Sequence, residues 1–353
     1  MLVNMNEVLP AARKNKYAVG LFNAVNLELA RGIIEAAEQT GSPVIMGTAE
    51  VLLPYTPLEE VAYYLIPMAK KAKVPVVVHF DHGLKKETCI KALDLGFSSI
   101  MYDCSTDGYE TNVQKVKEMT EIAHAYGATV EGELGHVGDN EGSAEGNSNL
   151  KNPSAYYTDP MQAKDFVQKT NVDALAIAVG TAHGAYKLPP KLDFNRIRQI
   201  ANTIDTPLVL HGGSGLTDSD FKKAIECGIS KVNIFTDINI AAVEAALSQF
   251  SSMNKGIIDL IPATVAAVKA EVIKKMELFG SVHQAKNTIS ETQISQIVEQ
   301  VLRELNKKIR DFRKNVKESE AGHLKMILGS PVFLVRCPGI WHSRYRHRNS
   351  RIK

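Results

Sequence analysis

Residues 79–83 read His-Phe-Asp-His-Gly and hold the first side chains that could do chemistry, Asp81 and His82. The apolar run 75–78 before them, closed by a glycine, is typical of a buried parallel strand. Histidine is the commonest metal ligand, and a neighbouring carboxylate is well placed to transfer a proton. The stretch predicts either a metal-dependent acid–base site or, with equal weight, a core histidine, an exposed histidine and a helix-capping aspartate.

Two further histidines follow apolar runs in the same way. His183 lies in Gly-Thr-Ala-His-Gly after the run 174–179, and His211 opens His-Gly-Gly-Ser-Gly after the run 207–210. Each of these histidines, like His82, is followed by glycine. Three protein ligands with an open fourth position are typical of a catalytic zinc site. If the three strands end on one rim, His82, His183 and His211 are the predicted ligands.

Glycine-rich and polar turns after the last two expected strands suggest a phosphate site. Loops at this place in an α/β barrel commonly bind phosphate through backbone N–H groups and a helix N-terminus. The candidates are Gly212, Gly213, Ser214, Asn233, Ile234, Phe235 and Thr236. A Gly-Gly-Ser-Gly turn alone is a weak signal, and its place beside a candidate metal ligand is what favours phosphate.

Two carboxylates end the expected strands 98–103 and 129–134. Asp103 and Glu133 could orient the metal ligands, hold a second metal or form structural ion pairs. We favour orientation of the ligands, since metal-binding histidines usually hydrogen-bond a carboxylate through their other ring nitrogen.

Eight strand–helix units must position these residues. The expected strands are 17–23, 43–48, 75–81, 98–103, 129–134, 173–179, 207–211 and 231–236, each followed by an amphipathic helical pattern. This alternation predicts an α/β fold, a (β/α)8 TIM barrel, with extra C-terminal helices at 262–279 and 290–312. A doubly wound open sheet is the second choice, although no G-x-G-x-x-G follows the first strand.

A long polar segment follows the fifth expected strand, at residues 136–158. Loops of this length are usually lids, binding loops or disordered segments. Because it leaves the same end of the barrel as the histidines, we expect an active-site lid.

Composition excludes several classes of protein. The chain has 353 residues, 44% hydrophobic and 23% charged, with a net charge of +2. Residues 307–353 hold 13 Lys/Arg and 3 Asp/Glu, against 28 and 36 in the rest, so the body is mildly acidic. An acidic body argues against nucleic-acid binding. Neither a membrane-spanning run nor a signal peptide is evident, and the four cysteines form no C-x-x-C pair, so we expect a cytoplasmic protein with reduced thiols.

Three segments are expected along the chain. They are a barrel domain at 1–285, a helical extension at 286–320 and a basic tail of unknown structure at 321–353. The apolar stripe of the helix expected at 290–312 is typical of core or of an oligomer contact. We therefore expect a homodimer or homotetramer.

Taken in order, these motifs resemble those of the class II, zinc-dependent ketose-bisphosphate aldolases, which act on fructose or tagatose 1,6-bisphosphate. The resemblance runs from the N-terminus to about residue 285. It implies Zn²⁺ on the three histidines, with a monovalent cation as a second candidate cofactor, and Asp81 as the proton donor and acceptor. It also places Gly184, with the residues of the two phosphate-binding turns, around dihydroxyacetone phosphate.

The resemblance also implies a catalytic glutamate in the segment 136–158. Glu141 is the candidate, but its surroundings depart from the family's glycine-rich, doubly acidic run, so Glu145 is the alternative. A lysine Schiff base is the other solution to aldol chemistry. It is disfavoured, because the sixth strand has no lysine and Lys231 is expected at the N-terminal end of its strand, far from the site.

Two competing functions remain open. One is a metal-dependent sugar-phosphate isomerase or epimerase on the same barrel, and the other is a non-catalytic phosphosugar-binding homologue. Retention of Asp81 and of all three histidines argues against the second.

Overall fold

The computed structural model describes residues 1–135, 137–139, 157–183, 190–250, 256–287, 302, 303 and 305. The chain divides into two compact units, Met1–Ser290 and Glu291–Lys353. In the second unit, Leu302, Arg303 and Leu305 are helical. Glu141, Glu145, Gly184 and the tail expected at 321–353 lie outside the described residues.

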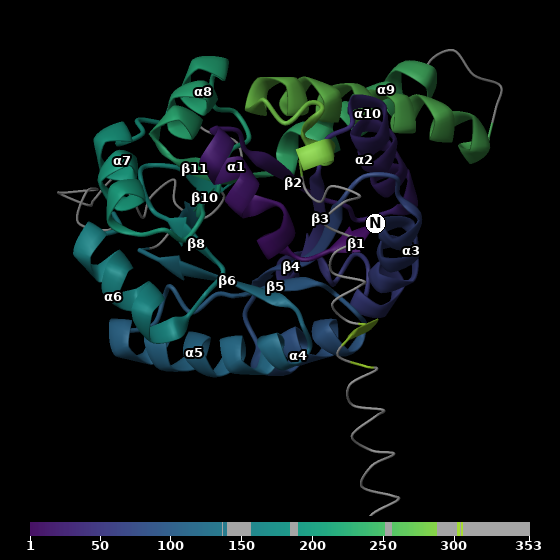
Figure 1. Cartoon of the computed structure of the whole chain (residues 1–353). Helices are drawn as coiled ribbons and strands as arrows, with labels where there is room; N and C mark the ends of the chain where they lie inside the picture. The colour runs from purple at the N-terminus through teal and green to yellow at the C-terminus, as the bar shows by residue number, and fades with distance from the viewer. Residues whose placement is uncertain are drawn as a thin grey trace, which may run out of the picture. The chain divides into compact units, whose positions relative to one another are not determined.

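Eight parallel strands close into a barrel in the first unit (Figure 1). Around the ring the order is β4, β3, β2, β11, β10, β8, β6, β5 and back to β4. The strands are β2 (Val19–Asn23), β3 (Val44–Ala49), β4 (Val76–Gly83), β5 (Ser99–Tyr102), β6 (Thr129–Leu134), β8 (Ala174–Ile177), β10 (Leu208–Leu210) and β11 (Ile229–Ile234). The (β/α)8 prediction is confirmed, and the open-sheet alternative is wrong because β4 pairs with β5 and closes the ring.

A helix follows each barrel strand and covers the outside of the ring. These helices are α2 (Leu27–Thr40), α3 (Leu58–Lys71), α4 (Lys86–Asp94), α5 (Tyr109–Ala125), α6 (Pro160–Thr170), α7 (Phe194–Thr203), α8 (Asp218–Cys227) and α9 (Thr236–Phe250). Several begin where the sequence offers a side-chain cap, such as Asn26 before α2 and Thr217 before α8. An additional helix, α10 (Leu260–Phe279), packs against α2 and α9.

The N-terminal segment closes the bottom of the barrel. The short strand β1 (Leu2–Val3) pairs with the first residues of β4, below the point where β5 begins. The 3-10 helix η1 (Met5–Glu7) and helix α1 (Leu9–Asn15) then lie across the ring of strands (Figure 1). Their apolar side chains pack with the inward-facing residues of the strands, which are Val19, Leu21, Ile45, Val77, Ala174, Ala176 and Val209. The barrel interior therefore has an apolar floor, and its polar groups lie toward the other end.

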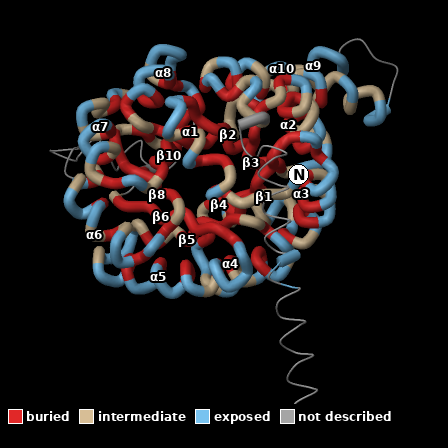
Figure 2. The backbone as a smooth tube through the Cα atoms, in the orientation of Figure 1, coloured by how far each residue is buried: buried red, intermediate tan, exposed pale blue. Residues whose placement is uncertain are grey.

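The strands of the barrel are buried, and the surrounding helices are exposed on their outer faces (Figure 2).

A second, two-stranded parallel sheet joins β7 (Gly138–Asp139) to β9 (Ala182–His183). The beginning of the segment expected as a lid thus runs beside the strand that carries His183. No helix among the described residues is long and apolar enough to cross a membrane.

Candidate active site

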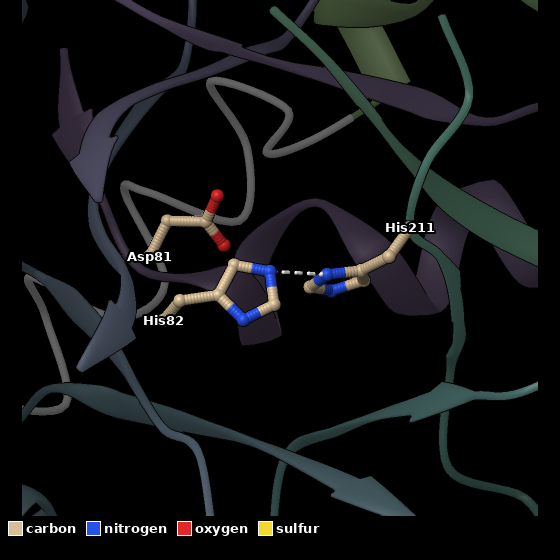
Figure 3. Close-up of side chains that lie close together, drawn as sticks. All are labelled: Asp81, His82 and His211. Atoms are coloured by element: carbon tan, nitrogen blue, oxygen red, sulfur yellow. Dashed lines mark hydrogen bonds between the residues drawn. The ribbon is translucent and has the colours of Figure 1, made fainter. Parts of the chain in front are cut away.

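The end of strand β4 turns two consecutive side chains into the barrel. Successive side chains of a regular strand point to opposite faces. Here the β4–β5 register shifts between Phe80 and Gly83, and His82 has a backbone φ of +43°, which is unusual for a residue other than glycine. This irregularity brings Asp81 and His82 to the same side of the strand, facing His211 (Figure 3).

The rings of His82 and His211 meet edge to face, with an interplanar angle of 87°. Nε2 of His82 lies 2.8 Å from Nδ1 of His211 (Figure 3). The other nitrogen of each ring is held by a carboxylate: His82 Nδ1 lies 2.8 Å from Asp103 Oδ2, and His211 Nε2 lies 2.7 Å from Glu131 Oε1. Carboxylates placed in this way orient histidine ligands toward a metal ion.

These donors fit a divalent metal ion. One ligand atom from each of Asp81, His82 and His211 lies within 4.8 Å of the others, as do those of His82, Asp103 and Glu133. Glu133 Oε2 is buried with no hydrogen-bond partner in the described part of the chain, and it lies 4.0 Å from His211 Nδ1. An unpartnered buried oxygen beside two converging ring nitrogens fits a nearby cation.

The third predicted ligand, His183, has its backbone in β9, while its side chain lies outside what the structure describes. The β9 segment nevertheless touches the turn after β10. A Cβ added to Gly212, whose φ is +64°, would lie 2.3 Å from the carbonyl oxygen of Ala182. The backbones around His183 and His211 are therefore in direct contact.

Asp81 is buried and held by two amides. Asn23 Nδ2 donates to Oδ2 at 2.9 Å, and Asn233 Nδ2 lies 3.2 Å from Oδ1 and 3.3 Å from Oδ2. Burial alone would raise the pKa of Asp81, but His82 and Lys231 outweigh it and lower that pKa well below its usual range. Asp81 is therefore an ionised carboxylate, able to accept a proton.

A charged layer lies directly beneath this carboxylate. Lys231 Nζ is 2.8 Å from Glu131 Oε2 and donates to Asn233 Oδ1 at 2.7 Å. His79, fully buried, has its Nδ1 2.9 Å from Ser99 Oγ and its Nε2 3.8 Å from Asp81 Oδ1. The expectation that Lys231 is far from the site is wrong, because its long side chain carries the ammonium group up to the site.

The pKa values of Asp103 and Glu133 are shifted in opposite directions. Burial raises the pKa of Asp103, but the hydrogen bond and charge of His82, together with hydrogen bonds from Ser105, lower it below its usual range. Burial, and then the negative charge of Asp103, raise the pKa of Glu133 to about 8. One Glu133 oxygen also accepts from the backbone N–H of Val137, just before β7.

The predicted phosphate-binding turns lie side by side, since β10 pairs with β11. A Cβ on Gly213 would lie 3.0 Å from the carbonyl oxygen of Asn233. Thr236 begins α9, so the N-terminus of that helix adjoins the two turns. Ser214 is buried, the Ile234 side chain packs in the core, and Phe235 is half-buried. Gly184 lies outside the described residues.

Asn23, Glu131 and Lys231 are the site residues that sequence reasoning did not identify. For Glu131 and Lys231 a signal exists in the two-residue period of the strands. Glu131 is two residues before Glu133, and Lys231 is two residues before Asn233, so each shares the inward face of its strand with a recognised residue.

A family model described as fructose-bisphosphate aldolase class-II matches residues 3–284. The chain belongs to the class-II fructose-bisphosphate aldolase family. A relative named probable fructose-bisphosphate aldolase, from Bacillus subtilis, is 38% identical over 292 residues, which is 80% of this chain and 99% of the relative. The crystal structure of the YdjI aldolase from Escherichia coli K12 has a TM-score of 0.72 and 35% identity, and the match covers 81% of this chain and 100% of that one.

Membership in this family makes the protein an aldolase, a lyase that acts on a phosphosugar. A fructose-bisphosphate aldolase of Thermus caldophilus is 39% identical over 312 residues, covering 81% of this chain and all of the relative. The family is typically metal-dependent, and the candidate site described above has groups that could hold a metal.

Proposed function

We propose that the protein catalyses the reversible, Zn²⁺-dependent cleavage of a ketose 1,6-bisphosphate to dihydroxyacetone phosphate and glyceraldehyde 3-phosphate. The observation that carries the proposal is the convergence of His82 Nε2 and His211 Nδ1, 2.8 Å apart, beside the ionised Asp81. This arrangement joins a site for a Lewis acid to a site for proton transfer.

His82, His183 and His211 would hold the metal. Asp103 would orient His82, and Glu131 would orient His211. Neutral imidazoles suit Zn²⁺, and three of them leave an open position for substrate. When bound, the ion would stabilise the negative charge that develops on the ketone oxygen as the carbon–carbon bond breaks. Glu133 is the candidate for a fourth or alternative ligand.

Asp81 would move the proton of the hydroxyl group on the fourth carbon. In cleavage it accepts that proton while the bond between the third and fourth carbons breaks, and in condensation it returns the proton to the aldehyde oxygen. The side-chain amides of Asn23 and Asn233, which are neutral, hold the Asp81 carboxylate in place through hydrogen bonds.

A second acid–base group must transfer the proton on the carbon of dihydroxyacetone phosphate, because Asp81 is occupied with the hydroxyl group on the fourth carbon of the sugar. We assign this role to Glu141, with Glu145 as the alternative. Support comes from β7, which starts the segment holding both glutamates and pairs Asp139 with His183. A loop anchored at this rim could close over substrate and exclude water.

The phosphate of dihydroxyacetone phosphate would bind between the two turns. Backbone N–H groups of Gly212, Gly213 and Ser214, with Asn233 to Thr236 and Gly184, form the proposed cradle. The N-terminus of α9 supports an anion there. A monovalent cation beside the phosphate is a second candidate cofactor.

A homodimer or homotetramer is also proposed. Helix α9 exposes Ile240, Val243, Leu247 and Phe250, which recur at helical spacing on one side. Light scattering that gives the mass of one chain would contradict self-association.

The three cysteines in the described residues are buried and form no disulfide, which supports a reducing compartment such as the cytoplasm.

Incubation of the zinc-loaded protein with fructose and with tagatose 1,6-bisphosphate tests the function. We expect triose phosphates from at least one of them, and the ratio of kcat/KM values identifies the preferred stereochemistry at the fourth carbon. An isomerase or epimerase would convert the sugar without releasing triose phosphates, and a binding protein would do neither.

A further inference from the structure

We infer that Lys231 is a positioning residue that joins the metal site to the proton-transfer site. Its ammonium group holds both Glu131, which contacts His211, and Asn233, which contacts Asp81. The inference rests on the proposed function, since it assigns a role in the same site.

Lys231 is placed where packing alone would favour an aliphatic side chain. It lies in register with Val19 of β2 and Val209 of β10, and both valines belong to the apolar floor of the barrel. The lysine is fully buried, yet its four-carbon stem lets the ammonium group reach past this floor to the polar layer above. A buried charge is tolerated only where it is paired, so the position requires partners.

The first partner connects Lys231 to the metal site. Glu131 divides its two oxygens between two neighbours: Oε2 lies 2.8 Å from the ammonium group, and Oε1 lies 2.7 Å from His211 Nε2. The hydrogen bond on one oxygen and the ion pair on the other restrain the orientation of the carboxylate. The carboxylate in turn orients the His211 ring, whose Nδ1 is directed toward His82.

The second partner connects Lys231 to Asp81. An ammonium group can only donate, so it selects the carbonyl oxygen of the Asn233 side chain. The amide nitrogen of Asn233 must then face the opposite way, where it lies 3.2 Å from Asp81 Oδ1. Lys231 and Asp81 therefore both favour the same orientation of the Asn233 side-chain amide.

Replacement of Lys231 by methionine keeps the length of the stem and removes the charge. We expect Lys231→Met to weaken Zn²⁺ binding by 10- to 100-fold, the usual effect of losing a group that orients metal ligands, as measured by competition with a chromogenic chelator. At saturating Zn²⁺, kcat should remain below that of the wild type while KM changes less than about threefold, because Lys231 contacts the side chain of Asn233 and not the backbone N–H groups proposed to bind phosphate.

Lys275→Met is the matched control. Lys275 lies on α10, is also buried and pairs with Asp237 and Glu271; among the described residues, no ion pair joins it to the metal donors or to Asp81. We expect this variant to lose stability and to keep the Zn²⁺ affinity of the wild type. If Lys231→Met does not fold, Lys231→Gln, which retains a donor without the charge, takes its place in every comparison.

A double-mutant cycle with Glu131→Gln separates positioning from a general loss of packing. If Lys231 acts through Glu131, the double variant should lose no more Zn²⁺ affinity than the weaker-binding single variant. Losses that multiply, or a folded Lys231 variant that binds Zn²⁺ as tightly as the wild type, would overturn the inference. A wild-type protein that binds no Zn²⁺ would instead refute the proposed function, and the inference with it.

Discussion

At the scale of single residues, the site depends on one irregular position in β4. A regular strand would point Asp81 inward and His82 outward, or the reverse. The left-handed backbone of His82 and the register shift beside it bring both to the site. Gly83 permits this turn, because a Cβ there would lie 2.4 Å from Cys89 Sγ and 2.8 Å from the carbonyl oxygen of Met101.

The Asp81→Asn variant tests the acid–base role. We expect the folded variant to bind Zn²⁺ as the wild type does, because the three proposed histidine ligands remain, as do the carboxylates that contact His82 and His211. Cleavage should fall by about 10²- to 10⁴-fold, the usual loss for a group that transfers a proton. Metal content by atomic absorption and kcat by a coupled assay give the two readings.

Asp81 also lies within reach of the metal donors of His82 and His211. A variant that loses Zn²⁺ together with activity would show that Asp81 is a ligand, which would contradict the role assigned to it here.

Sequence patterns could identify Asp81, His82 and His211 because each ends an apolar run. The two-residue period puts Lys231 on the inward face of its strand, but its backbone lies low in β11, and the pattern does not show that the length of its side chain brings the charge to the site. Nor could they show that Asp103 and Glu131 each hold a different histidine, because these contacts join strands that are distant in the sequence.

At the scale of elements, the strands and helices lie close to their predicted positions, because most strands are mainly apolar and several helices start at a capping side chain. The β7–β9 pair was not predicted, since two-residue strands carry no periodicity. Helix α9 begins at Thr236, inside the polar turn expected after the last strand, so its first turn is part of the proposed phosphate-binding motif.

Contact between the turn after β10 and strand β9 gives a testable prediction at Gly212. Gly212→Ala should raise KM for the bisphosphate and lower Zn²⁺ affinity, because the new methyl group would clash with the Ala182 backbone and the positive φ is strained. Gly108→Ala is the control, since an added Cβ there meets nothing within 4 Å. Equal KM and metal affinity in both variants would contradict a role for this contact.

The segment that follows β7 supplies the next prediction. Glu141→Ala should slow exchange of the dihydroxyacetone phosphate proton with solvent, followed by NMR in deuterium oxide, while the affinity for substrate stays nearly unchanged. The Glu145→Ala variant is the comparison and should lose much less. If exchange survives in the first variant and fails in the second, the base is Glu145.

At the scale of the whole molecule, the family match ends at residue 284 and the first compact unit ends at Ser290. The basic tail expected from residue 321 shares neither the strand–helix pattern nor the family motifs. A protein that ends before Ala321 should therefore keep the kcat/KM of the full chain. A folded but inactive truncated protein would show that the tail completes the site.

Removal and return of the metal test the central claim most directly. Dialysis against a chelator should abolish cleavage of the bisphosphate, and addition of one equivalent of Zn²⁺ per chain should restore it. The His211→Ala variant should remain inactive after the same addition, since one of the two converging nitrogens is gone. Full activity in protein shown to be metal-free would contradict the account.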